Sequence, residues 1–184
     1  VERVEAGEKP STVIKAHVAH NSGNNEWYTP PEFIAAAREA MGGIDCDPAT
    51  SEFANENVGA PTFYTAETDG LDQEWNGRVW LNPPYSQPLI RHFCEAVADR
   101  FMGGEISAAC VLVNNGTETK WFQYMLTHGA AAVCFPRGRI KYLDATGTPA
   151  NTPLQGQAVI YFGLDVESFA EAFEDIGCVV HVIS

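Results

Sequence analysis

The stretch that decides the fold is Arg78-Val79-Trp80-Leu81, followed directly by Asn82-Pro83-Pro84-Tyr85. The first four residues form a mostly apolar run that is typical of a buried strand. Pro83 fixes its own φ angle, and each proline restricts the residue before it to extended geometry. We therefore expect a strand that ends in a rigid polar turn.

The turn offers acceptors for hydrogen bonds, because neither proline has a backbone N–H. The side-chain oxygen of Asn82 and the carbonyl of Pro83 can together accept both hydrogens of one NH2 group. Tyr85 offers a flat face on which a ring can stack. This chemistry predicts a site that holds an exocyclic amino group for attack on a methyl donor. A plain proline-rich turn after a strand is the alternative interpretation.

Strands and helices are expected to alternate along the chain. Strands are predicted at residues 44–47, 63–65, 78–81, 108–113, 131–135, 157–162 and 178–183, and helices at 32–41, 88–101, 119–127 and 166–176. This alternation indicates an α/β fold with a mostly parallel sheet and helices on both faces. Residues 51–62 are polar, and we expect them to be irregular with one helical turn. Thr29 is predicted to cap the first helix, with Pro30 and Pro31 in its first turn.

Two polar motifs each follow a predicted strand. Asp47-Pro48 comes after the first strand, and Asn82–Tyr85 comes after the strand at 78–81. In open α/β sheets, ligands bind in the crevice at the carboxyl ends of the strands. The sequence therefore predicts an active site at this edge of the sheet.

Composition favours one compact domain in a reducing compartment. The chain has 184 residues and is 45% hydrophobic, and we assign residues 25–184 to one domain behind an N-terminal arm, residues 1–24, that is partly disordered or docked on a neighbour. No membrane-spanning run or signal-peptide pattern is visible, so a cytoplasmic location is expected. The five cysteines are scattered without a CxxC pair, which favours buried thiols and argues against a metal site.

The net charge of −13 is unusual for a chain that binds nucleic acid, because phosphate contacts normally need a basic surface. It predicts weak, strongly salt-dependent binding, or help from a partner. The concentrated basic stretch holds Arg137, Arg139 and Lys141, whose alternation puts them on one face of an extended segment. These side chains can grip DNA phosphates, and a solvated strand end is the alternative.

Seven motifs in order resemble the phage-type DNA N6-adenine methyltransferases. They are Trp27-x-Thr29-Pro30, Asp45-x-Asp47-Pro48-Ala49, Asp69-Gly70-Leu71, Trp75-x-Gly77, Asn82-Pro83-Pro84-Tyr85-Ser86, Thr117-x-Thr119-Lys120-Trp121 and Arg137-Gly138-Arg139-Ile140. The resemblance covers roughly residues 25 to 163. It implies a Rossmann-like methyltransferase fold, S-adenosylmethionine as the donor and adenine in DNA as the acceptor. A phage-encoded enzyme would act in the host cytoplasm.

The resemblance also implies roles for particular residues. The catalytic motif would be Asn82, Pro83, Pro84 and Tyr85, and the cofactor-binding residues would be Trp27, Thr29, Pro30, Asp47, Pro48, Ala49 and Asp69. Two features depart from the usual methyltransferase pattern. The turn at 47–51 contains no glycine, and only about 35 residues separate the two main motifs, so the cofactor site is expected to be trimmed.

In the expected reaction, an adenine is flipped out of the duplex, stacks on Tyr85 and is methylated at N6. Two alternatives remain at this level. The same motif suits another acceptor, such as cytosine N4, guanine N2 in RNA or a glutamine amide. The other alternative is a DNA- or protein-binding module that has kept the fold but no longer binds the methyl donor.

Overall fold

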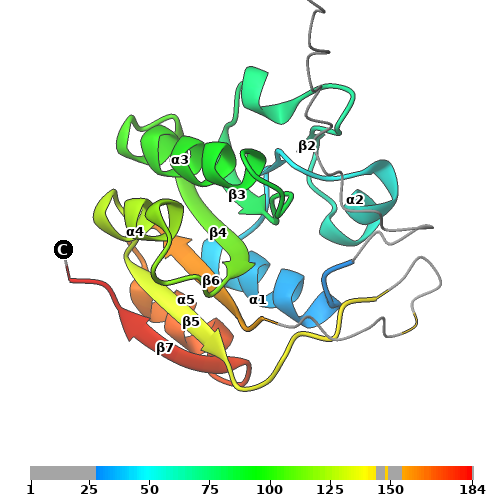
Figure 1. Cartoon of the computed structure of the whole chain (residues 1–184). Helices are drawn as coiled ribbons and strands as arrows, with labels where there is room; N and C mark the ends of the chain where they lie inside the picture. Colours follow the sequence, from blue (N-terminus) through cyan, green and yellow to red (C-terminus); the bar gives the residue numbers. More distant parts are fainter. Residues whose placement is uncertain (1–27, 144–147, 149–154, 184) are drawn as a thin grey trace, which may run out of the picture.

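The computed structural model describes residues 28–143, 148 and 155–183 (Figure 1). The predicted N-terminal arm, residues 1–24, and Trp27 lie outside the described residues. Within the described part, strands alternate with helices in the predicted order. The predicted α/β class is confirmed.

The described residues form a seven-stranded sheet in the order β2-β1-β3-β4-β6-β5-β7. The strands are β1 (Cys46–Asp47), β2 (Thr62–Phe63), β3 (Gly77–Leu81), β4 (Ile106–Asn114), β5 (Ala132–Pro136), β6 (Gln157–Phe162) and β7 (Gly177–His181). The strand expected before the Asn82 turn is thus present as β3 and lies in the interior of the sheet.

The sheet is mixed in direction. β1 pairs with β2 and β3 in parallel, and β3 pairs with β4 in parallel. β6 runs antiparallel to both β4 and β5, and β7 runs antiparallel to β5. Strands β1 to β5 therefore point one way, and β6 and β7 point the other. No described helix lies between β5 and β6, so these consecutive strands can pair without the helical crossover that a parallel pair needs.

Helices cover both faces of the sheet, as predicted. They are α1 (Pro31–Met41), α2 (Glu52–Val58), α3 (Leu89–Met102), α4 (Lys120–Thr127) and α5 (Val166–Phe173), with a short 3-10 helix η1 (Gly70–Asp72). Helices α3 and α4 pack on one face, and α1 and α5 pack together on the other (Figure 1). Helix α2 lies beside the β1–β2 end of the sheet (Figure 1).

Strand β3 shows how the sequence places its side chains. Val79 and Leu81 pack with α3 and α4, whereas Trp80 packs with α1 and α5. All three are at most 1% exposed. Successive strand residues point to opposite faces, so a strand covered on both sides must be apolar throughout. This packing fixes where β3 ends and where the Asn82 turn begins.

Two local predictions were wrong. Residues Glu52–Val58 form helix α2 rather than one turn, because Ser51 accepts a hydrogen bond from the Ala54 N–H (3.2 Å) and Gly59 ends the helix at φ 61°. Thr29 does not cap α1. The helix begins at Pro31 with Pro30 at the N-cap, since a residue that precedes a proline is held extended. The Thr29 hydroxyl therefore has a different partner, described below.

The core contains unlinked thiols. All five cysteines are free, and four of them are buried: Cys46, Cys94, Cys110 and Cys134. Burial raises the pKa of the Cys46 thiol to about 11, so it stays protonated and packs as an apolar group. None of the described helices is long and apolar enough to cross a membrane.

Candidate active site

The two predicted motifs meet at the point where the strand order reverses. From β1 the chain moves to β2 on one side and then to β3 on the other side. Ligands in open α/β sheets bind outside the carboxyl ends of the strands at such a switch point. Asp47 ends β1, and Asn82 directly follows the end of β3. The structure therefore brings these residues together as expected.

A cavity of about 570 Å³ opens at this switch point. Its walls include Thr29, the turn at 47–51, Asp69, the turn Asn82–Tyr85 and Tyr142. The volume lies in the range of pockets that bury small ligands and cofactors. The polar motifs thus share one ligand-sized pocket.

Asn82 has a defined amide orientation. Its Nδ2 donates a hydrogen bond to Thr29 Oγ1 (3.3 Å), and its Oδ1 accepts one from the Tyr85 hydroxyl (3.3 Å). The prolines that follow fix the backbone of the turn. The result is an oxygen acceptor held on the pocket wall.

Tyr85 has an exposed ring and a buried hydroxyl. The residue is 40% exposed, yet its hydroxyl lies 3.3 Å from Asn82 Oδ1, 3.4 Å from the Leu112 carbonyl oxygen and 3.4 Å from the Tyr142 hydroxyl. Burial, with a smaller contribution from Tyr142, raises the pKa of Tyr85 well above its usual value. The hydroxyl therefore remains neutral and anchors the ring, which lines the pocket.

Tyr142 and Tyr28 are site residues that sequence reasoning missed. Tyr142 is 3% exposed, and its hydroxyl touches that of Tyr85. Tyr28 lines the pocket and forms two backbone hydrogen bonds with Leu143, each 2.9 Å long. The alternation of exposed Arg139 and Lys141 with apolar neighbours was a signal that Tyr142 points inward.

Asp47 is a buried carboxyl at the end of β1. It is 2% exposed, and its Oδ1 accepts a hydrogen bond from the Ala49 N–H (3.2 Å). Burial raises the pKa of Asp47 to about 7, although hydrogen bonds from Ala49 and Thr50 lower it in part. The turn is also tied to the strand beside it, because the Tyr64 N–H donates to the Asp47 carbonyl oxygen (3.0 Å). A turn without glycine is thus held firmly enough to form a pocket wall.

Asp69 and Gly70 form the part of the pocket wall that packs against the turn at 47–51. Asp69 has a φ of 47°, a backbone conformation that few residues other than glycine adopt. Its carboxylate accepts a hydrogen bond from the Leu71 N–H (3.1 Å). A Cβ on Gly70 would lie 1.9 Å from the Pro48 carbonyl oxygen. Only glycine therefore allows these two turns to touch.

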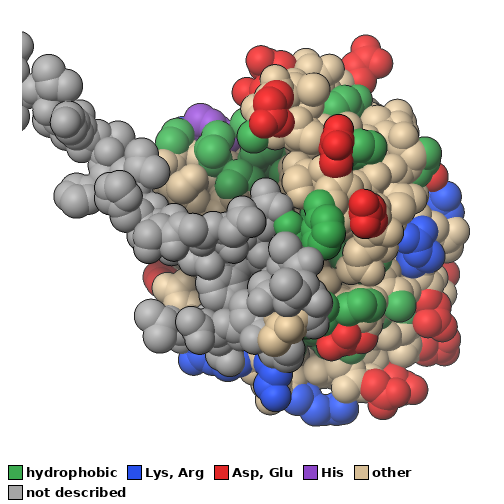
Figure 2. Space-filling view, turned by 90° about the vertical axis from the view of Figure 1, so that its right-hand side faces the viewer, with side chains coloured by type: hydrophobic (Ala, Val, Ile, Leu, Met, Phe, Trp, Pro, Cys, Tyr) green, Lys and Arg blue, Asp and Glu red, His purple; other side chains and the backbone are tan. Residues whose placement is uncertain are grey.

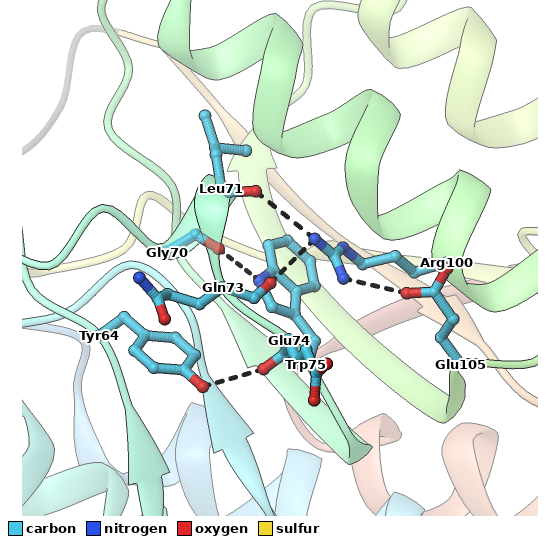
Figure 3. Close-up of polar contacts among 8 residues, drawn as sticks. All are labelled: Tyr64, Gly70, Leu71, Gln73, Glu74, Trp75, Arg100 and Glu105. Atoms are coloured by element: carbon cyan, nitrogen blue, oxygen red, sulfur yellow. Dashed lines mark hydrogen bonds and ion pairs between the residues drawn. The ribbon is translucent and has the colours of Figure 1, made fainter.

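A set of polar contacts fixes the segment that follows Gly70 (Figure 3). The Trp75 indole N–H donates to the Gly70 carbonyl oxygen (2.7 Å), and the Arg100 guanidinium donates to the carbonyl of Gln73 (3.0 Å). The same guanidinium lies 4.8 Å from the centre of the Trp75 ring, and Tyr64 donates to the carbonyl of Glu74 (2.9 Å). Trp75 and Arg100 therefore hold Gly70, and with it Asp69, beside the pocket.

Two residues of the resemblance lie elsewhere. Pro30 is buried at the start of α1 and does not form part of the pocket wall, and Asp45 binds the Arg78 guanidinium through both carboxylate oxygens (2.7 and 2.8 Å). Arg78 holds the pKa of Asp45 below its usual value. Asp45 thus joins β1 to β3 at the end of the strands away from the pocket.

The basic residues follow β5 and lead toward the pocket. Arg137, Arg139 and Lys141 are exposed, whereas Ile140 and Tyr142 between and beyond them are 3% exposed. The Arg137 guanidinium donates to the Asp175 carbonyl oxygen (3.0 Å). In the face that Figure 2 shows, Lys and Arg side chains lie along the lower edge and on the right-hand side, and Asp and Glu side chains lie at the top, the centre right and the lower right.

An open α/β sheet with a ligand-sized pocket at its switch point defines the Rossmann-like class of fold. The family model for DNA N-6-adenine-methyltransferase (Dam) matches residues 16–169, and the chain belongs to this family. Members of the family use S-adenosylmethionine as methyl donor. The resemblance inferred from the motifs is thereby confirmed.

A DNA N-6-adenine-methyltransferase of Escherichia phage T1 is 47% identical to the chain over 66 residues. The match covers 35% of this chain and 26% of the phage protein, so the chain spans about a quarter of that relative's length. No solved structure matches the chain significantly.

Proposed function

We propose that this chain transfers a methyl group from S-adenosylmethionine to the N6 amino group of adenine in DNA. The observation that carries the proposal is the Asn82 amide, whose oxygen is held on the wall of a ligand-sized pocket at the switch point. Membership of the adenine-specific family supports the same reaction.

The pocket suits the proposed donor in size and in charge. Its volume of about 570 Å³ accommodates a cofactor, and Asp69 brings a carboxyl group to the wall for a ligand with sulfonium and ammonium charges. When bound, the donor supplies an electrophilic methyl group. Thr29, Asp69 and the turn from Asp47 to Ala49 would hold it. Trp27 and Pro30 remain predictions of cofactor contact.

The acceptor site follows from the chemistry of the adenine N6 group. Its lone pair is delocalised into the ring, so the nitrogen is a poor nucleophile. The Asn82 side-chain oxygen and the Pro83 carbonyl would accept its two hydrogens and favour a localised lone pair. Positive charge grows on the nitrogen as the methyl group arrives, and two fixed acceptors stabilise this charge more in the transition state than in the ground state. Asn82 has no basic form, so the proton leaves to water afterwards.

The substrate would reach the pocket by base flipping. The amino group of a paired adenine is enclosed in the duplex, and extrusion costs a few kcal/mol. The exposed ring of Tyr85 would stack on the flipped base. Arg137, Arg139 and Lys141 would bind phosphates beside it, since their side chains lie on the surface next to the segment that enters the pocket wall.

Three further assignments complete the proposal. We assign the catalytic domain to residues 25–184 and the N-terminal arm to residues 1–24, and the enzyme would act in the cytoplasm, which is that of the host cell if a phage encodes it. No metal takes part. Among the described residues, no group of three or more His, Cys, Asp or Glu side chains could hold a metal ion.

The test is Asn82→Ala. Transfer to DNA should fall by about a hundredfold or more, because a fixed polar group that stabilises the transition state is lost. Donor affinity, measured by calorimetry, should stay close to wild type. Asn76→Ala is the matched control, since Asn76 is an exposed asparagine next to the other end of β3 and should keep full activity.

The product decides between the proposed acceptor and its alternatives. Mass spectrometry of digested DNA should find N6-methyladenine after incubation with labelled donor. Label found only in RNA or protein would replace DNA as the acceptor. If the wild type did not bind the donor, the chain would be a binding module without methyltransferase activity.

A further inference from the structure

The Thr29 hydroxyl is in contact with one end of the Asn82 amide. The oxygen and nitrogen of an asparagine side chain are nearly the same size, so shape alone does not choose between them. Thr29 Oγ1 accepts a hydrogen bond from Asn82 Nδ2 at 3.3 Å and is 7% exposed. We propose that Thr29 is a positioning residue that keeps the Asn82 oxygen available to the target amino group. This inference rests on the proposed function of Asn82.

Thr29 is itself held by three parts of the chain. The Asn57 amide of helix α2 donates to the Thr29 carbonyl oxygen (3.1 Å), and Pro30, the N-cap of helix α1, follows Thr29 directly. On its other side, Tyr28 is paired with Leu143 by two backbone hydrogen bonds. The hydroxyl therefore occupies a fixed position over Asn82, which lies 53 residues further along the chain.

The contacts of Tyr85 explain how the amide oxygen becomes free for substrate. A tyrosine hydroxyl has one hydrogen to donate. Three acceptors lie within reach of it: Asn82 Oδ1 at 3.3 Å, the Leu112 carbonyl oxygen at 3.4 Å and the Tyr142 hydroxyl oxygen at 3.4 Å. When a target amino group donates to Asn82, Tyr85 can turn its hydrogen to Leu112. The exchange leaves no polar group without a partner.

The same contacts would favour the wrong orientation if Thr29 lost its hydroxyl. A flipped amide would donate from its nitrogen to the Tyr85 oxygen, and Tyr85 would donate to Leu112. That arrangement has one hydrogen bond more than the productive orientation, in which the amide N–H would face a methyl group. A flipped amide also presents hydrogens to the hydrogens of the substrate. Thr29 thus opposes an arrangement that the rest of the site would prefer.

Thr29→Val tests this role. Its kcat on an adenine-containing oligonucleotide should fall about five- to tenfold, which corresponds to the net value of one hydrogen bond. Because Thr29 also lines the proposed donor site, kcat is measured at saturating donor, and the thermal midpoint should stay close to wild type. Thr29→Ser keeps the hydroxyl and should remain within about twofold of the wild-type kcat.

A rescue experiment separates orientation from general damage. Asn82→Asp has two equivalent acceptor oxygens, so the orientation of its side chain no longer matters. In that background, adding Thr29→Val should cost about twofold or less, as a double-mutant cycle would show. An equal loss in both backgrounds would mean that Thr29 acts in another way and would overturn the proposal.

NMR spectroscopy can report the orientation of the Asn82 amide independently of enzymatic activity. The side-chain NH2 signals of Asn82 are identified by their loss in Asn82→Asp. They should shift in Thr29→Val and stay in place in Thr29→Ser. Unchanged signals together with unchanged kcat in Thr29→Val would refute the role of Thr29, whereas an inactive wild type would refute the proposed reaction and leave the NMR result to decide the orientation.

Discussion

Asp47 shows how one buried side chain links stability to pH. The carboxyl is 2% exposed and receives a hydrogen bond from Ala49. Burial penalises its charged form more than this bond favours it, so its pKa is raised to about 7 from an ordinary value of 3.8. Close to neutral pH, the folded protein therefore holds a proton that the unfolded chain has released.

We expect the free energy of unfolding to fall as the pH rises from about 4 to about 7 and to level off above that. In this window the folded state binds more protons than the unfolded state, so each pH step disfavours folding. Asp47→Asn keeps an acceptor for Ala49 and cannot ionise. Urea unfolding at several pH values should show that the advantage of Asp47→Asn over wild type grows through this window.

Asp72→Asn, in η1 and exposed, is the control and should follow the wild-type profile. Parallel pH profiles for wild type and Asp47→Asn would show that Asp47 titrates at its ordinary pKa. The same comparison below pH 4 should find the smallest difference between the two proteins.

The sequence predicted the residues at the strand ends but not their partners. Asn82 and Asp47 were recognisable because each follows an apolar strand. The contacts of Thr29 with Asn82 and of Tyr142 with Tyr85 join residues 53 and 57 positions apart. Periodicity reports which side of an element a residue faces and carries no information on distances of this kind. Thr29 was assigned to a helix cap for this reason.

At the scale of elements, the pocket depends on the contact between the β1 turn and η1. The Gly70 backbone touches the Pro48 carbonyl, and Trp75 and Arg100 hold it there. The two strands that flank this contact, β1 and β2, have two residues each. Side-chain contacts therefore replace long strand pairing at this end of the sheet.

Gly70→Ala should damage this contact. The added Cβ would lie 1.9 Å from a backbone oxygen, so one of the turns must move. We expect a loss of about 1–3 kcal/mol in unfolding free energy, typical of overpacking, together with weaker donor binding. Urea unfolding and calorimetry measure the two effects.

Gly138→Ala is the matched control for Gly70→Ala. A Cβ at Gly138 meets nothing within 4 Å, and its stability should match wild type. Should both variants be equally stable and bind the donor equally well, the contact between Gly70 and Pro48 would not support the pocket.

The sequence predicted most elements because their apolar faces are regular, as in β3 and α3. Helix α2 was underestimated because Val58 is its one buried residue, so it has no apolar stripe that periodicity can detect. The antiparallel direction of β6 could not be predicted from the sequence either. An apolar strand reads the same in either direction, and the connection from β5 has no described helix to settle it.

At the scale of the whole molecule, charge opposes the binding of DNA. The net charge is −13, so a small group of cations must attract phosphates against a repulsive background. Lys141 is exposed and adjoins Tyr142 of the pocket wall, whereas the Arg137 guanidinium is bonded to the Asp175 carbonyl. The three residues are therefore not expected to contribute equally.

Lys141→Gln and Arg139→Gln should each reduce the slope of log K against log salt by about 0.9 on duplex DNA, the value for one phosphate contact. Arg137→Gln should change it less. Fluorescence anisotropy over a salt series measures these slopes. Glu171→Gln, which changes the charge on helix α5, is the control and should leave the slope unaltered. Unaltered slopes in all three basic variants would show that residues 137–141 do not bind the DNA.

The pairing of Tyr28 with Leu143 has a mechanical consequence. Its two hydrogen bonds tie the residue before Thr29 to the residue after Tyr142, and these two neighbours touch the Asn82–Tyr85 turn. A phosphate bound by Lys141, as proposed, would therefore lie next to the backbone segment that positions both neighbours. A free nucleoside has no such phosphate, so we expect turnover to depend on the length of the strand and not only on its base.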